Sequence, residues 1–218
     1  MEEFDKRSEE IDTLFAHIEN LDLQRNGLGA STLDSLISIL ASSLSLMLYN
    51  QVESTAFSCV EAIYDGVHEK KVSFNKLVPG FKKKILNDCR QAYHSVESLM
   101  RGIENNDISE VLAKTSLRLD KVFSGNVDAK RLREVLGSYN LILRGPTDRN
   151  QGADLLSLKT ARNSLAHGSA SFEKHGRGLT MSDLGELRNN IREYMSHVIA
   201  MTAQYLQEER YLNPAGVA

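Results

Sequence analysis

The sequence predicts an all-α protein, an antiparallel helical bundle with long helices and short connecting loops. Apolar residues recur every three or four positions in several long segments, which is the spacing of one helix face. The 218 residues include only 3 prolines, so little interrupts these segments. No segment shows the alternation of polar and apolar residues that is typical of a strand. We therefore expect one helical domain over residues 1–212 and a disordered tail over residues 213–218.

The expected helix limits follow from the apolar spacing and from local start and stop signals. Thr180 and Asp183 have the form of a capping box, which predicts the start of the last long helix. Gly168 is expected to end the helix before it, at the C′ position. Earlier helices are expected at about residues 3–23, 31–67, 81–103, 108–117, 128–143 and 154–167.

Charge, cysteine content and hydropathy narrow the function classes. The formal net charge of −3 argues against nucleic-acid binding driven by overall charge, although a local basic site can still hold phosphates. Cys59 and Cys89 lie in different apolar segments, so we expect reduced thiols in a cytoplasmic protein. The acidic N-terminal residues show no secretory signal. The most apolar stretch, residues 33–49, is interrupted by serines, and we expect it to be too short and too polar to span a bilayer.

One segment, RNSLAHG at residues 162–168, combines charged and titratable side chains with a helix stop. Arg162 occupies a position in the apolar stripe where a leucine is expected. An unpaired buried guanidinium is costly, so Arg162 either pairs with a carboxylate or lines an interface or cleft. Asn163 and His167 are four residues apart and share a helix face. Arg162 and His167 are about 140° apart around the helix axis, so two such helices meeting at a dimer axis would bring these groups together.

These residue types suit the cleavage of RNA by its own 2′-hydroxyl group. A histidine that titrates near neutral pH can move the proton or act as a charged stabiliser, and an arginine offers a fork of donors to the phosphate oxygens. The other histidines show no metal-ligand spacing, so we expect neither a metal nor another cofactor. A purely structural interpretation stays open, with Arg162 in a buried ion pair and His167 as a helix cap.

Basic side chains outnumber acidic ones around this segment. Residues 144–177 hold six basic and three acidic side chains, and the resulting local charge of +3 suits a phosphate-binding groove. We expect Lys159, Lys174 and Arg177 to contact RNA. Residues 176–178, Gly-Arg-Gly, lack the context of a dinucleotide-binding motif and are expected to form a flexible loop.

The segment RNSLAHG resembles the Arg-x4-His signature of the HEPN superfamily, small helical proteins of which many are metal-independent endoribonucleases in toxin–antitoxin and antiviral systems. Three further stretches resemble the bacterial MAE-type HEPN nucleases: LYNQVESTAFSCVEAIYD at residues 48–65, FSGNVDAKRLREVL at 123–136 and GRGLTMSDL at 176–184. The resemblance covers most of the chain.

The resemblance implies a function and a set of site residues. Arg162 and His167 match the invariant pair of the family, and Asn163 matches the polar residue that is common after the arginine. Glu53, with Asn50 one turn earlier, lies in a matching segment, and we expect it to pair with Arg162. The implied protein is a metal-independent endoribonuclease that cleaves RNA as a homodimer, acts as a toxin or antiviral-defence effector, and has an antitoxin or defence-system partner. The alternative is a non-catalytic HEPN-type protein that binds nucleotides or RNA, or serves as a dimeric scaffold.

Overall fold

We describe the protein from a computed structural model, which defines residues 2–25, 30–92, 95, 97–98, 100–101, 122–123, 125–143 and 151–214. The elements are α1 (Glu2–Leu23), α2 (Ala30–Glu69), η1 (Phe74–Lys76), α3 (Pro79–Ala92), α6 (Ala129–Ser138), α7 (Gln151–Ala166), α8 (Phe172–Gly176) and α9 (Met181–Gln207). Within the described ranges no strand forms, and a single isolated bridge joins Leu77 to Leu212. The all-α fold class is confirmed.

The chain forms two compact units. The first comprises Met1–Thr55, Asn126–Ala129 and Gly145–His197, and the second comprises Ala56–Gly125, Lys130–Arg144 and Val198–Ala218. The long helices α2 and α9 contribute residues to both units. The expectation of one domain over residues 1–212 stays a prediction. At the start of the predicted tail, the backbone N–H of Asn213 donates to the Lys76 carbonyl oxygen at 2.7 Å.

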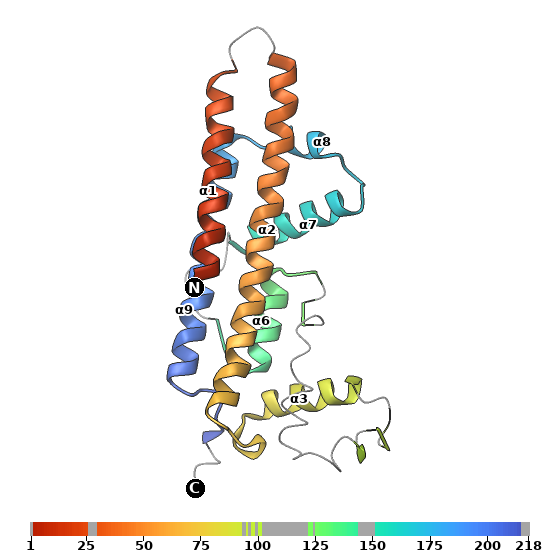
Figure 1. Cartoon of the computed structure of the whole chain (residues 1–218), viewed down its shortest axis with the longest axis vertical. Helices are drawn as coiled ribbons and strands as arrows, with labels where there is room; N and C mark the ends of the chain where they lie inside the picture. Colours follow the sequence, from red (N-terminus) through yellow and green to blue (C-terminus); the bar gives the residue numbers. More distant parts are fainter. Residues whose placement is uncertain are drawn as a thin grey trace. The chain divides into compact units, whose positions relative to one another are not determined.

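The first unit is held together by an apolar core with polar ties around it. Here α1 and the first half of α2 run antiparallel and side by side (Figure 1). The best-buried core residues include Ile11, Ile18, Leu44, Leu48, Leu184 and Ile191, each at most 1% exposed. Removing one such side chain from water stabilises the fold by about 1.5–3 kcal/mol. Gln51 of α2 donates to Ser8 Oγ of α1 at 2.7 Å, and Arg192 of α9 reaches Asp12 of α1 at 2.7 Å.

The second unit is built around buried aromatic rings. The rings of Tyr64, Phe81 and Tyr139 meet edge to face, with centroids 4.9–5.7 Å apart. Such pairs stabilise a core beyond the area they bury. The Tyr205 hydroxyl donates to the Tyr139 carbonyl oxygen at 2.7 Å. Burial raises the pKa of Tyr64, Tyr139 and Tyr205 above the ordinary tyrosine value.

The observed limits of α1, α2 and α7 lie within three residues of the predicted ones. The capping box at the start of α9 is confirmed, because Thr180 N–H donates to Asp183 Oδ2 at 2.9 Å and Asp183 N–H donates to Thr180 Oγ1 at 3.1 Å. The part of the predicted helix 81–103 that follows Ala92 is only partly described, and the predicted helix at 108–117 lies outside the described residues.

One predicted helix end was wrong. The helix expected over residues 128–143 is α6, which ends at Ser138. Asn140 adopts a left-handed conformation with φ 68°, and the Leu141 N–H turns back to the Leu136 carbonyl at 3.0 Å. This is the hydrogen-bond pattern of a helix stop, for which asparagine is the usual substitute for glycine.

The apolar character of α2 was also underestimated. By length and composition alone, Ser31–Glu69 could cross a membrane, contrary to the expectation that this region is too short and too polar. One such helix is only a weak indication of a membrane span, because the core helix of a soluble protein meets the same criterion. In its most apolar stretch, 39% of the residues are buried inside the protein.

Candidate functional site

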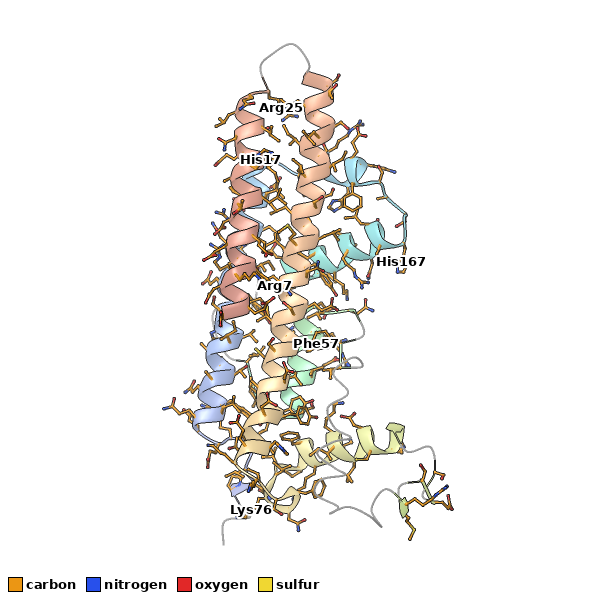
Figure 2. All side chains as sticks on the ribbon, in the orientation of Figure 1. Arg7, His17, Arg25, Phe57, Lys76 and His167 are labelled. Carbon is orange, nitrogen blue, oxygen red and sulfur yellow. The ribbon has the colours of Figure 1, made fainter. Side chains whose placement is uncertain are left out.

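The end of α7 presents His167 to solvent. Gly168 takes a φ of 69°, the Ser169 N–H bonds to the Ser164 carbonyl at 3.0 Å, and the Gly168 N–H bonds to the Leu165 carbonyl at 3.2 Å. These bonds form the Schellman motif, so the predicted helix stop at Gly168 is confirmed. His167 is exposed at this end of the helix (Figure 2), where the helix dipole favours a cation.

Arg162 is half-buried on the same helix and is held by two neighbours. Its guanidinium carbon lies 5.6 Å from the ring centroid of Tyr49, a residue of α2 that is 1% exposed. An arginine over an aromatic face is attracted by the negative charge of the ring face. Its Nη1 also donates to Asn163 Oδ1 at 3.0 Å.

No acid neutralises Arg162 within the part of the chain that the structure describes. Its hydrogen bond to Asn163 is to an amide, and none of its nitrogens is both buried and without a partner. The Arg162 side chain is only half-buried, so part of it reaches solvent. Of the two interpretations drawn from the sequence, a buried ion pair is not what the structure shows.

Among the ion pairs of the described residues, none joins Arg162 to Glu53, its predicted partner. Tyr49, one helical turn before Glu53, is the residue of α2 that contacts the guanidinium. Burial has the largest effect on the pKa of Tyr49 and raises it. The hydrogen bond from Val127 and the positive charge of Arg162 lower this pKa, whereas the Glu53 carboxylate raises it further. Both charged groups therefore act on Tyr49. Asn50, the other predicted supporting residue, is exposed on α2.

Three consecutive residues before α6, Asn126–Asp128, are tied to the helices of this site. Asn163 Nδ2 donates to Asn126 Oδ1 at 3.3 Å. The next residue, Val127, donates its backbone N–H to the Tyr49 hydroxyl at 3.1 Å. Asp128 forms an ion pair with Lys159. Neither Tyr49 nor Asn126 is predicted from the sequence as a site residue, although both lie in the stretches that resemble HEPN nucleases.

The three basic residues predicted to contact RNA differ in their surroundings. Lys159 is part-buried and already paired with Asp128. Arg177 is exposed and paired with Glu173 one turn earlier on the chain. Lys174 is exposed, and within the described residues its ammonium makes no ion pair. Lys174 is thus the most available of the three.

The segment after the motif contains the short helix α8, which ends at Gly176, so the loop expected at residues 176–178 is reduced to the turn after that helix. The short helix α8 packs on α2 so closely that a Cβ atom on Gly176 would lie 1.8 Å from the Ser38 carbonyl oxygen. The Ser42 hydroxyl of α2 donates to the Phe172 carbonyl at 2.6 Å and lies 3.0 Å from His175 Nδ1. Because that hydroxyl proton is engaged, His175 Nδ1 must be the donor to Ser42. Burial lowers the pKa of His175.

A cavity of about 500 Å³ lies elsewhere in the first unit. It is lined by Asp22, Arg25, Asp34, Ile37, Ser38, Gly176, Arg177, Leu179, Thr180, Met181 and Leu184. Neither Arg162 nor His167 lines it. The motif residues therefore lie outside this cavity.

The all-helical fold and the position of Arg162 and His167 at the end of α7 agree with the HEPN-type domain that the sequence predicts. The chain belongs to the MAE_28990-like HEPN family, whose model matches residues 1–211. Membership of this family indicates a nuclease, RNA-related or defence role, and HEPN domains are often ribonucleases that act on RNA as dimers. Neither a curated protein nor a solved structure matches the chain.

Proposed function

We propose that this protein is a metal-independent endoribonuclease of HEPN type. The observation that carries the proposal is the environment of the Arg162 and His167 side chains. Arg162 is fixed by Tyr49 and Asn163 but is not neutralised by an acid among the described residues, and His167 is exposed at the end of the same helix. A phosphate-binding cation and a titratable group thus lie on one helix.

The proposed reaction is attack of an RNA 2′-hydroxyl on the adjacent phosphorus. The new bond joins the 2′-oxygen to phosphorus, and the bond from phosphorus to the 5′-oxygen breaks. The products are a 2′,3′-cyclic phosphate and a 5′-hydroxyl, so no water is consumed. His167 moves the proton between the attacking and leaving oxygens. Arg162 stabilises the additional negative charge that the phosphorane carries.

Other predicted residues take supporting roles in this proposal. Asn163 orients Arg162 through its side-chain oxygen. From α2, the Glu53 carboxylate contributes to the electrostatic field of the site, and Asn50 forms part of its edge. Lys174 and Arg177 contact the RNA backbone, and Lys159 contributes positive charge while it stays paired with Asp128.

The proposed active form is a homodimer with a composite cleft. Five residues of helix separate Arg162 from His167 by about 140° and about 7.5 Å along the axis. A second subunit supplies the complementary groups. We place the protein in the cytoplasm, away from membranes, as a toxin or antiviral-defence effector controlled by an antitoxin or another defence-system protein.

Cleavage of labelled RNA in excess EDTA tests the enzyme directly. We expect the wild-type protein to cut RNA and to leave a 2′,3′-cyclic phosphate, and we expect RNA that is 2′-O-methylated throughout to stay intact. His167→Ala should lower the rate at least about a hundredfold, because a general acid–base group contributes that much. The matched control is His17→Ala, which removes an exposed histidine from α1 (Figure 2) and should cut like wild type. Absence of cleavage by the partner-free wild type over a broad RNA panel would sink the proposal.

A non-catalytic HEPN-type protein that binds nucleotides or RNA, or acts as a dimeric scaffold, is the second candidate. Polar groups near the motif are bonded to one another within the protein, which favours this candidate. Asn163 hydrogen-bonds to both Arg162 and Asn126, and Lys159 pairs with Asp128. Calorimetry with RNA and with nucleotides separates the two candidates. Binding without cleavage supports a binding protein, and dimerisation without either supports a scaffold.

A further inference from the structure

The Asn126–Asp128 segment connects the two helices that form the site. Asn126 contacts α7 through Asn163, Val127 contacts α2 through the Tyr49 hydroxyl, and Asp128 contacts α7 through Lys159. Each of the three consecutive residues therefore makes a different contact. The segment therefore contacts both Asn163 and Tyr49, the two residues that hold Arg162.

The hydrogen bonds around Asn163 allow one orientation of its amide. Its Oδ1 accepts from Arg162 Nη1 at 3.0 Å, and its Nδ2 donates to Asn126 Oδ1 at 3.3 Å. A flipped amide would place its NH₂ group against the guanidinium donors and its oxygen against the Asn126 oxygen. Both contacts would then be repulsive. The guanidinium requires the Asn163 oxygen to face it, and in this arrangement Asn126 holds the opposite end of the same amide.

Tyr49 acts on the same arginine by a second route. Its ring faces the guanidinium, and its hydroxyl accepts the backbone N–H of Val127, a residue that is fully buried. The ring and the hydroxyl have separate functions: one attracts Arg162, and the other fixes the segment that orients Asn163. A buried N–H without an acceptor is unfavourable, so loss of the hydroxyl would loosen this segment.

We propose that Asn126 and Tyr49 are positioning residues, which hold the Arg162 guanidinium in a fixed orientation toward a phosphate. This rests on the proposed function for the identity of the ligand, an RNA phosphate. The positioning itself concerns this chain's own side chains. A variant that loses the orientation of Arg162 keeps its positive charge. The loss of positioning should therefore lower the rate of RNA cleavage more than the affinity for RNA.

Paired substitutions separate positioning from folding. Asn126→Ala removes the acceptor for Asn163, whereas Asn126→Asp keeps an oxygen there. Tyr49→Phe keeps the ring and removes the hydroxyl, whereas Tyr49→Leu removes both. The control is Asn189→Ala in α9, because Asn189 also accepts from the arginine that precedes it, Arg188. Thermal unfolding confirms that each variant is folded before it is compared.

Kinetics, RNA binding, the ¹⁵N NOE and hydrogen exchange test the inference. We expect Asn126→Ala to lower kcat about tenfold, with KM and the Kd for fully 2′-O-methylated RNA changed less than about twofold. Asn189→Ala should stay close to wild type in kcat. Asn126→Asp adds a negative charge near Arg162, so it is compared by the order of the Arg162 side chain and not by kcat. The ¹⁵N NOE of the Arg162 Nε–Hε group should be that of an ordered side chain in wild type and Asn126→Asp, and should fall in Asn126→Ala and Tyr49→Leu. Tyr49→Phe should speed hydrogen exchange at the Val127 amide.

The NMR measurement does not depend on catalysis, so the two proposals fail separately. If wild type cuts no RNA but the Arg162 signal loses order in Asn126→Ala, the positioning inference holds and the proposed function fails. If Asn126→Ala and Tyr49→Leu leave the Arg162 NOE and the rate unchanged in folded protein, the positioning inference is overturned, whether or not the protein is a ribonuclease.

Discussion

Whether a cationic side chain can bind a phosphate depends on whether an acid already neutralises it. Lys159 and Arg177 each form an ion pair within the protein. Among the described residues, Arg162 makes a hydrogen bond to the Asn163 amide and a cation–π contact with Tyr49, but no ion pair, so its charge stays available. A phosphate that displaces water from Arg162 breaks no ion pair of the described residues. At the scale of single residues, Arg162 therefore differs from Lys159 and Arg177 in its surroundings and not in its charge.

His175 makes the stability of the first unit depend on pH. Burial lowers its folded pKa below the ordinary value of 6.5. In the unfolded chain His175 takes up a proton near pH 6.5, whereas the folded protein resists protonation to a lower pH. The unfolded state thus binds more protons in this window, so the free energy of unfolding decreases as the pH falls below 6.5. Urea unfolding at pH 7.5 and pH 5.5 measures this decrease.

His175→Gln isolates the contribution of this residue. A glutamine amide can still donate to Ser42 but does not titrate in this range. We expect the variant to lose part of the pH dependence that wild type shows below pH 6.5. An identical pH dependence in the two proteins would show that the His175–Ser42 contact does not control proton uptake.

At the scale of elements, the sequence predicts helix limits well where the signal is local. Gly168 and the Thr180–Asp183 capping box lie within a few residues of the ends they specify, and both are confirmed. The stop at Asn140 was missed because asparagine at this position is a weaker signal than glycine. The helix α8 was missed because five residues provide little apolar periodicity, and its position depends on contact with α2.

Gly176 allows the backbones of α8 and α2 to approach each other. In Gly176→Ala the new Cβ would meet the backbone oxygen of Ser38 at 1.8 Å, and a backbone atom cannot rotate away. We expect a loss of about 3 kcal/mol in the free energy of unfolding, in the range of overpacked sites. Urea unfolding measures the loss, and hydrogen exchange over α8 should rise.

The neighbouring glycine provides the control. A Cβ on Gly178 would lie 3.9 Å from the His175 carbonyl oxygen, an ordinary contact distance. Gly178→Ala should therefore unfold close to wild type. Equal stability of the two alanine variants would contradict the close packing of α8 on α2.

At the scale of the whole molecule, the family and the fold class could be predicted from the sequence, but the candidate site only in part. Arg162, Asn163 and His167 are adjacent in one helix, and a linear motif can specify them. Tyr49 and Asn126 contact that helix from positions 113 and 37 residues away from Arg162 and Asn163. No local pattern encodes such pairs. The structure places Tyr49, one helical turn before Glu53, against Arg162, because spacing along α2 does not say which of its residues faces α7.

A composite site makes one further prediction, about mixed dimers. Arg162→Ala and His167→Ala should each be inactive alone. A heterodimer of the two variants retains one intact arginine and one intact histidine, on different subunits. If a productive site takes its arginine and histidine from different subunits, the heterodimer should recover cleavage. Random pairing would place about half of the dimers in this form.

Co-expression with two different affinity tags isolates the heterodimer, and RNA cleavage in excess EDTA measures its activity. The control is the same purification with both tags on Arg162→Ala chains, which should stay inactive. If the isolated heterodimer stays as inactive as its parents, a site built from one arginine and one histidine of different subunits is ruled out. In a site within one subunit, the long Arg162 side chain would have to reach around its own helix, at the cost of its contacts with Tyr49 and Asn163.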